Sequence, residues 1–234
     1  MNKKINIIYE DKDILVIDKQ DGLIVESDKK GEKTLENILD IELPRSGIVH
    51  RLDKDTSGLM VVAKNEKSLV NLQNQFASKK VRKIYYALVF GKLEPKEGTI
   101  DLALKRDPKN RTRFIASRAK DAREAVTHYE VEHYVENSPS TSSGQFLSFL
   151  KIKIETGRTH QIRAHFFAIG YPVIGDQIYK NVESQIASEK IGLKRQFLHA
   201  GEIEFAHPRT GKKMNFKVDL PEDLKRILEK CTKG

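Results

Sequence analysis

A polar segment set between two apolar runs constrains the fold of this chain more than any other feature. Residues 50–58 read HRLDKDTSG, with the short run 48–49 before them and the longer run 59–63 after them. The longer run has the length and composition of a buried strand, and Ser57-Gly58 can turn the chain into it. Charged side chains at such a point lie on a loop held by a rigid scaffold, where functional residues concentrate.

Several interpretations of this segment compete. A solvated turn would use Asp53 and Asp55 only to bend and cap the chain. A calcium loop would need a bidentate glutamate at its twelfth position, where this chain has Lys64, so we exclude calcium. A magnesium-dependent aspartyl phosphatase would need buried apolar residues before Asp53, and His50-Arg51 stand there instead. The remaining interpretation is a nucleophilic or basic Asp53 beside an arginine, in a site that handles an anionic polymer.

The charge of the chain favours a polyanionic partner. Lys and Arg number 42 against 33 Asp and Glu, which gives a net charge of +9. Residues 105–123 contain eight basic and two acidic side chains, and a second basic cluster covers 79–83. The single cysteine, Cys231, excludes a disulfide within the chain and a cysteine-based zinc site. The sequence shows no signal peptide and no membrane span, so we expect a cytoplasmic protein.

Apolar periodicity predicts an α+β fold with a mixed, largely antiparallel sheet. Expected strands cover 5–9, 14–17, 59–63, 82–90, 99–104, 111–115, 125–135, 146–155, 196–205 and 214–218. Expected helices cover 34–39, 159–169, 181–190 and 221–230, and another begins at Asn65. Thr34, Asn65 and Thr159 are the expected N-caps. Residues 136–144 form a polar loop without expected chemistry.

Three stretches resemble the RluA family of pseudouridine synthases. The first is His50-Arg51-Leu52-Asp53 followed by Thr56-Ser57-Gly58-Leu59. Residues 83–87, KIYYA, resemble the family's K-x-Y-x-A motif, and 156–165, TGRTHQIRAH, resemble its third motif. Residues 125–127, 174–176 and 198–200 also fall in the family's order. The resemblance runs from about residue 8 to about residue 216. It implies one catalytic domain over 1–234, with flanking helices and a bent sheet crossed by a cleft. The chain before Asp53 is too short for the separate N-terminal RNA-binding domain that many members carry, so we expect the catalytic domain itself to hold RNA.

The resemblance implies an isomerase that converts uridine to pseudouridine in RNA. The enzyme must break the bond from ribose to base nitrogen, rotate the base and rejoin it through carbon, which demands no metal or redox cofactor. Asp53 would be the catalytic nucleophile or base. Arg163 would form an ion pair with Asp53 and hold its pKa down. Tyr85 would stack on the uracil or take part in the final proton transfer; without the resemblance, a core role for Tyr85 is preferred.

The remaining expectations concern RNA. The target uridine must be flipped out of its helix, and Arg51 would fill its place or hold the flipped nucleotide, or else contact a phosphate. Further RNA contacts are expected from a set of polar residues: His50, Lys83, Arg158, His160 and Gln161. For Arg158 and His160, internal hydrogen bonding is an equal alternative. The substrate would be a stem-loop of rRNA or tRNA, and the protein a monomer. The alternative functions are a non-catalytic RNA-binding or folding factor and, after it, a magnesium-dependent aspartyl phosphatase that uses Asp53 and Asp55.

Overall fold

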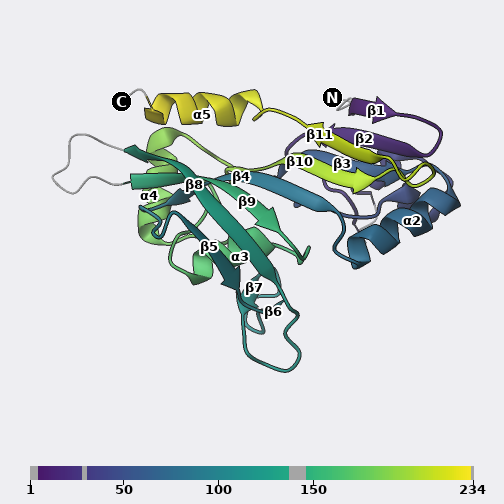
Figure 1. The fold of residues 1–234 in the computed structure, drawn as a ribbon. Helices are drawn as coiled ribbons and strands as arrows, with labels where there is room; N and C mark the ends of the chain where they lie inside the picture. Colours follow the sequence, from purple (N-terminus) through teal and green to yellow (C-terminus); the bar gives the residue numbers. More distant parts are fainter. Residues whose placement is uncertain (1–4, 28–30, 137–145, 233–234) are drawn as a thin grey trace. The chain divides into compact units, whose positions relative to one another are not determined.

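A computed structural model describes residues 5–27, 31–136 and 146–232 of the chain (Figure 1). These residues form two compact units. The first unit consists of Met1–Lys83 and Ala200–Asp219, and the second of Ile84–His199 and Leu220–Gly234. The expected polar loop at 136–144 lies outside the described residues except for Glu136. No helix within the described ranges is long and apolar enough to span a bilayer.

The first unit is built on β1 (Asn6–Glu10), β2 (Ile14–Lys19), β3 (Ser57–Ala63), β10 (Leu198–Ala206) and β11 (Lys213–Lys217). Within it the strand order is β1-β2-β3-β10, and β11 pairs with β10. The β1–β2, β2–β3 and β10–β11 ladders are antiparallel. In the β2–β3 ladder, Lys19 lies opposite Gly58, so the end of β2 is beside the point where the polar segment enters β3.

The core of the first unit lies between the sheet and one helix. All seven residues of β3 are buried, which confirms the predicted buried strand. Helix α2 (Glu66–Ala77) packs Leu69 and Leu72 against this sheet. Asn65 caps α2 by accepting a hydrogen bond from the backbone N–H of Ser68, and Thr34 caps the short helix α1 (Leu35–Leu39) in the same way. Both N-cap predictions are confirmed. A 3₁₀ turn, η1 (Pro44–Gly47), precedes the polar segment.

The second unit contains the sheet of β4 (Arg82–Phe90), β9 (Phe146–Ile154), β8 (Val126–Glu136) and β5 (Glu97–Asp101), in this order. The three ladders that join these strands are antiparallel. A separate hairpin pairs β6 (Leu104–Arg106) with β7 (Phe114–Ala116). The helices of the second unit are α3 (Gln161–Ala168), α4 (Val182–Ile191) and α5 (Glu222–Thr232). The predicted α+β class with a mostly antiparallel sheet is confirmed.

Two local predictions for the second unit were wrong. The strand expected at 99–104 is divided, because Asp101 still pairs with β8 whereas Leu104 pairs with Ala116 of the hairpin. The helix expected to start with Thr159 as its N-cap begins later. Its N-cap is His160, in the left-handed conformation (φ 56°, ψ 19°) and without a side-chain capping bond. The side chain of Gln161 instead accepts a hydrogen bond from the N–H of Arg158 just before this helix.

Candidate active site

His50 packs inside the first unit. Its Nε2 accepts a hydrogen bond from the backbone N–H of Val61 at 3.0 Å, and its ring stacks on Phe76 with the centroids 4.6 Å apart. Burial, followed by the positive charge of Lys83, lowers the pKa of His50 to about 3. The imidazole is therefore neutral at physiological pH, as an accepting Nε2 requires. These contacts fix the start of the polar segment, and an RNA contact by His50 stays a prediction.

Lys83 lies near the same aromatic ring. Its Nζ is 5.9 Å from the centroid of Phe76, and burial lowers the pKa of Lys83 to about 8. Because the ammonium loses its proton around this pH, any contact between Lys83 and a phosphate would weaken in mildly alkaline solution. The predicted RNA contact by Lys83 is not tested by these distances.

The turn that carries Asp53 is held by a buried lysine that the sequence analysis did not assign to the site. The Nζ of Lys19 donates hydrogen bonds to the carbonyl oxygens of Gln20, Leu23 and Lys54, each at 3.0 Å. Lys19 is 2% exposed, and a buried ammonium is tolerated only where its donors are satisfied. Because Lys54 directly follows Asp53, the ammonium fixes the backbone at the predicted catalytic residue.

The same turn leaves two predicted site residues accessible. Arg51 is exposed and Asp53 is half-buried, whereas Leu52 between them is only 4% exposed. The turn ends at Gly58, whose φ of 118° favours glycine. A Cβ at this position would lie 2.3 Å from the carbonyl oxygen of Ala200. The segment is therefore a tightly held backbone in which Arg51 is exposed and Asp53 is half-buried.

In the second unit, Arg163 and Asp176 form a buried bidentate ion pair. Nε of Arg163 is 2.6 Å from Oδ2 of Asp176, and Nη2 is 2.9 Å from Oδ1. The two side chains are 5% and 0% exposed. Backbone N–H groups of Ile178 and Tyr179 also donate to Oδ1, at 2.8 and 2.9 Å. Gly175 permits this turn, because a Cβ there would lie 1.9 Å from a carbonyl oxygen of a neighbouring loop.

The predicted site residues divide between the two units. The first unit contains His50, Arg51, Asp53 and Lys83, and the second contains Tyr85, Arg158, His160, Gln161 and Arg163. The expected ion pair between Asp53 and Arg163 would join one residue of each unit, and it stays a prediction. Asp176 is a partner of Arg163 that the sequence analysis did not foresee.

Gln161 uses its whole amide inside the second unit. Its Nε2 donates to the carbonyl oxygen of Val126 and to the hydroxyl of Thr127, both at 3.0 Å. Its Oε1 accepts from the hydroxyl of Thr156 at 2.7 Å and from the N–H of Arg158 at 3.0 Å. Two donors and two lone pairs are the full capacity of an amide. The geometry favours a role in holding this turn, and an RNA contact by Gln161 stays a prediction.

Arg158 and His160 both make internal hydrogen bonds. Nε of Arg158 donates to the carbonyl oxygen of Glu124 at 2.9 Å, and Nδ1 of His160 lies 3.1 Å from the hydroxyl of Tyr179. Both residues are half-buried, so these bonds leave part of each side chain at the surface. Of the two alternatives, internal hydrogen bonding is therefore present, and phosphate contact stays a prediction.

Tyr85 lies in β4 opposite Ile152 of β9 and is 7% exposed. This burial is what a core residue requires. A base that stacked on its ring would have to reach the small exposed part of the side chain. Stacking or proton transfer by Tyr85 stays a prediction.

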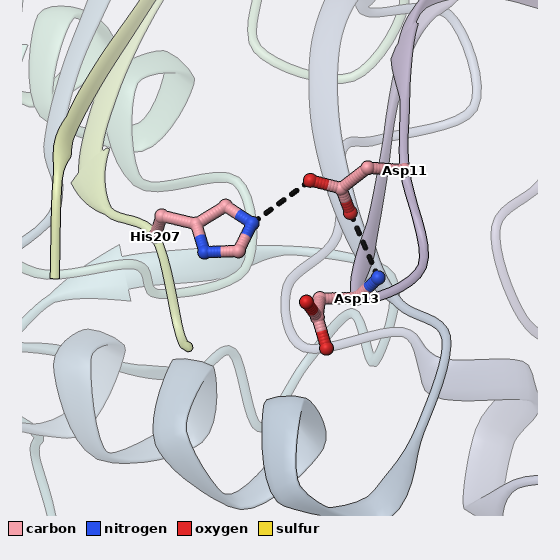
Figure 2. Close-up of side chains that lie close together, drawn as sticks. All are labelled: Asp11, Asp13 and His207. Atoms are coloured by element: carbon pink, nitrogen blue, oxygen red, sulfur yellow. Dashed lines mark hydrogen bonds and ion pairs between the residues drawn. The ribbon is translucent and has the colours of Figure 1, made fainter. Parts of the chain in front are cut away.

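A cluster of Asp11, Asp13 and His207 lies in the first unit, where the β1–β2 turn meets the loop after β10 (Figure 2). Nε2 of His207 is 2.8 Å from Oδ2 of Asp11, which also accepts from the hydroxyl of Tyr9. Arg209 forms a two-point ion pair with Asp13, both distances being 2.7 Å. These carboxylates already have donors and a countercharge, so the arrangement forms an ionic cluster between two loops.

Comparison with known families shows which protein family the chain belongs to. A family model described as RNA pseudouridylate synthase matches residues 13–168, which include Asp53, Tyr85 and Arg163. The chain belongs to this family. Within it the chain is of the RluA type, and members of the family isomerise uridine to pseudouridine in RNA.

Relatives of this pseudouridine synthase match nearly its whole length. An uncharacterized RNA pseudouridine synthase of Aquifex aeolicus (strain VF5) is 41% identical over 97% of this chain and 72% of the relative. A protein of Nitrosomonas europaea named ribosomal large subunit pseudouridine synthase D is 38% identical over 96% of this chain and 64% of the relative. The solved structure of human RNA pseudouridylate synthase domain containing 1 has a TM-score of 0.75 at 25% identity, covering 96% of this chain and 88% of that structure.

Two residues of this pseudouridine synthase, Lys19 and Asp176, have roles that no sequence pattern predicted. Asp176 had a signal, because residues 174–176 fall in the order of the family's motifs. Lys19 had only its place at the end of an apolar strand, where a lysine is ordinarily solvated. Neither signal indicates which atoms the side chain contacts, because both contacts form only when separate elements of the fold pack together.

Proposed function

We propose that this pseudouridine synthase modifies one or a few uridines in a stem-loop of large-subunit ribosomal RNA, with Asp53 as the nucleophile or base. The observation that carries the proposal is the turn at Asp53. Its backbone is fixed by the Lys19 ammonium, and Asp53 is half-buried two residues after the exposed Arg51. Rigid positioning of a carboxylate is what attack on a bound nucleotide requires.

The proposed chemistry proceeds by detachment and rejoining of the base. The bond between C1′ of the ribose and N1 of the uracil breaks, and the base rotates. C5 then bonds to C1′, and C5 loses its proton while N1 gains one. Arg163 would stabilise the carboxylate of Asp53, and Tyr85 would contact the uracil. Arg51 would hold the flipped nucleotide. The enzyme would need no metal or redox cofactor.

Two properties of the chain support the choice of RNA target. The net charge of +9 supplies the long-range attraction of a nucleic-acid-binding protein, and the segment 105–123 concentrates basic side chains on and beside the β6–β7 hairpin. Lys109 and Arg111, between the two strands, are exposed. A relative that covers 96% of this chain is named for the ribosomal large subunit. We therefore place large-subunit rRNA ahead of tRNA.

The same proposal includes the organisation of the protein. Residues 1–234 would act as one catalytic domain made of two compact units, as a cytoplasmic monomer. Size-exclusion chromatography with light scattering would test the monomer, and a dimer mass would overturn it.

Pseudouridine mapping tests the proposed function. Total RNA from a deletion strain, complemented with wild-type, Asp53→Asn or Asp55→Asn protein, is treated with a carbodiimide and read by reverse transcription. We expect one or a few sites in large-subunit rRNA to vanish on deletion and to return with the wild type and Asp55→Asn, but not with Asp53→Asn. If deletion changes no uridine, and rescue of the deletion phenotype requires Asp53, Asp55 and magnesium, phosphatase chemistry would be favoured.

The mapping also tests the alternative from another class. If deletion changes no uridine in any RNA, but wild-type and Asp53→Asn proteins both rescue a ribosome-assembly defect, the chain acts as a non-catalytic RNA-binding or folding factor. A site that vanishes from tRNA instead would retain the isomerase and overturn the rRNA target.

A further inference from the structure

The ion pair of Arg163 is tied to the basic β6–β7 hairpin through one buried tyrosine. Tyr179 is 1% exposed. It follows Asp176 by three residues, and its backbone N–H donates to Oδ1 of Asp176 at 2.9 Å. Its ring also lies under the guanidinium of Arg163, with Cζ 5.2 Å from the ring centroid. The tyrosine therefore contacts both members of the ion pair.

The hydroxyl of Tyr179 reaches the hairpin. It accepts a hydrogen bond from the backbone N–H of Phe114, the first residue of β7, at 2.7 Å. It also lies 3.1 Å from Nδ1 of His160, the N-cap of α3. Because a hydroxyl that accepts from an N–H keeps its own proton to donate, Nδ1 of His160 is assigned as the acceptor. One oxygen atom thus joins the hairpin to the helix that carries Arg163.

Arg113 adds a second connection between the hairpin and this tyrosine. Its guanidinium lies over two rings, with Cζ 5.1 Å from the centroid of Phe167 and 5.4 Å from that of Tyr179. Its Nε is buried and has no hydrogen-bond partner among the described residues. The two aromatic faces therefore hold a large part of this side chain. Figure 1 shows β7 close to α3, as these contacts require.

Backbone hydrogen bonds connect the exposed loop of the hairpin to Arg113. The N–H of Arg113 donates to the carbonyl oxygen of Asn110 at 2.9 Å, and the N–H of Asp107 donates to the carbonyl oxygen of Arg113 at 3.0 Å. The exposed Lys109 and Arg111 lie within the loop that these bonds close. A displacement of the loop would therefore move Arg113 and the amide of Phe114 with it.

We propose that Tyr179 is a positioning residue that couples RNA held by the β6–β7 hairpin to the geometry of the Arg163–Asp176 ion pair. The inference rests on the proposed roles of Arg163 in the reaction and of the hairpin in RNA contact. Tyr179 itself touches no reacting atom. RNA bound to Lys109 and Arg111 holds the hairpin in one position. Through the hydrogen bond of its hydroxyl to β7, Tyr179 then holds the turn at Asp176 in one position as well. Substrate binding and the rate of the chemical step are thereby linked.

A kinetic double-mutant cycle tests the coupling. Single-turnover formation of pseudouridine is measured on a transcript of large-subunit rRNA, giving a maximal rate constant and a half-saturating enzyme concentration. We expect Lys109→Ala/Arg111→Ala to raise the half-saturating concentration and to lower the maximal rate constant about tenfold. Tyr179→Phe, which removes only the hydroxyl, should lower the maximal rate constant by a similar factor. In the combined variant the rate constant should fall no further, while the half-saturating concentration still rises.

If the two effects multiply, so that the maximal rate constant of the combined variant falls about a hundredfold, the coupling is overturned. A wild-type rate constant for Tyr179→Phe would overturn it as well. Tyr134→Phe is the matched control, because it removes a hydroxyl that donates to the carbonyl oxygen of Leu93 elsewhere in the second unit. It should lose comparable stability but keep the wild-type response to the hairpin substitution.

A second variant and a second measurement keep the test decisive. If Tyr179→Phe does not fold, Arg113→Met breaks the other connection and should give the same non-additive rates. Hydrogen exchange is then measured on Asp53→Asn protein with and without total ribosomal RNA. RNA should slow amide exchange at 176–179, and Tyr179→Phe or Arg113→Met should abolish this protection. Protection that persists in both variants would overturn the coupling, whereas a wild type that binds RNA but forms no pseudouridine would overturn only the proposed reaction.

Discussion

The ammonium of Lys19 donates a hydrogen bond to the carbonyl oxygen of Lys54 at 3.0 Å, which joins the end of β2 to the residue that follows Asp53. The two residues are 35 positions apart in the sequence. Two more carbonyl oxygens, of Gln20 and Leu23, receive bonds from the same ammonium. The ammonium thus takes the place of the backbone donors that ordinarily hold a turn. Removing it should loosen the backbone at Asp53, the predicted catalytic residue.

Lys19→Met should therefore destabilise the protein by about 2–4 kcal/mol, since it removes three hydrogen bonds from an ammonium, one of them buried. Urea unfolding followed by circular dichroism measures this change. Lys12→Met, at an exposed lysine of the same region, is the control and should change stability by less than about 0.5 kcal/mol. A loss equal to that of the control would show that the ammonium does not hold the turn.

Asp176→Asn should cost about 3–5 kcal/mol, because it breaks a buried bidentate ion pair by neutralising one member. Asp223→Asn is the matched control: Asp223 pairs with Arg195 at 2.7 Å but its side chain is 48% exposed. That change should cost only about 1 kcal/mol or less.

Replacing both members of the pair separates stability from activity. Arg163→Met/Asp176→Leu removes both buried charges and should recover much of the stability lost in Asp176→Asn. The same double variant should form no pseudouridine if Arg163 acts in the reaction. Thermal unfolding and single-turnover assays on the same preparations measure the two properties. Full activity in the double variant would remove Arg163 from the mechanism.

His50 should make the protein sensitive to mild acid. Its pKa is about 3 when folded, against an ordinary value of 6.5. A base whose pKa is lower in the folded state favours the unfolded state on protonation. Its contribution is therefore complete above about pH 6.5 and declines as the pH falls from there toward 3. The slope has an upper bound of about 1.4 kcal/mol per pH unit.

His50→Gln tests this pH dependence, because the amide oxygen of glutamine can accept the Val61 hydrogen bond without titrating. Urea unfolding at pH 7, 6, 5 and 4 should show the stability difference between variant and wild type shrinking or reversing as the pH falls. Stability curves that stay parallel over this range would mean that another group controls the acid sensitivity.

Chelators and divalent cations should leave the cluster of Asp11, Asp13 and His207 unchanged. Burial alone would raise the pKa of Asp11, but hydrogen bonds from the backbone N–H groups of Asp13 and Ile14, from His207 and from Tyr9 hold it below its ordinary range. The unfolding temperature should therefore be the same with EDTA, magnesium or zinc. A rise of several degrees with one metal, lost in His207→Ala, would instead identify a metal site.

The sequence by itself determined the strands, most helix limits and the family motifs. β4 occupies the predicted residues 82–90, and Asn65 caps α2 as predicted. These features depend on apolar periodicity and on hydrogen bonds between near neighbours, which local sequence encodes. The strand expected at 99–104, which is divided, and the misplaced start of α3 are exceptions. At α3 the N-cap is His160 without a side-chain capping bond, and Gln161, held by Val126 and Thr127 of β8, accepts the N–H of Arg158 before the helix.

Only the tertiary structure decided which partners the charged side chains have. The Lys19 ammonium bonds to Lys54, 35 residues away, and Arg163 pairs with Asp176, 13 residues away. The hydroxyl of Tyr179 accepts from the amide of Phe114, 65 residues away. No periodicity in the sequence specifies such contacts, because they arise when independently formed elements pack and each buried polar group must find a partner. The motifs therefore located the candidate site, whereas packing determined how its side chains are held.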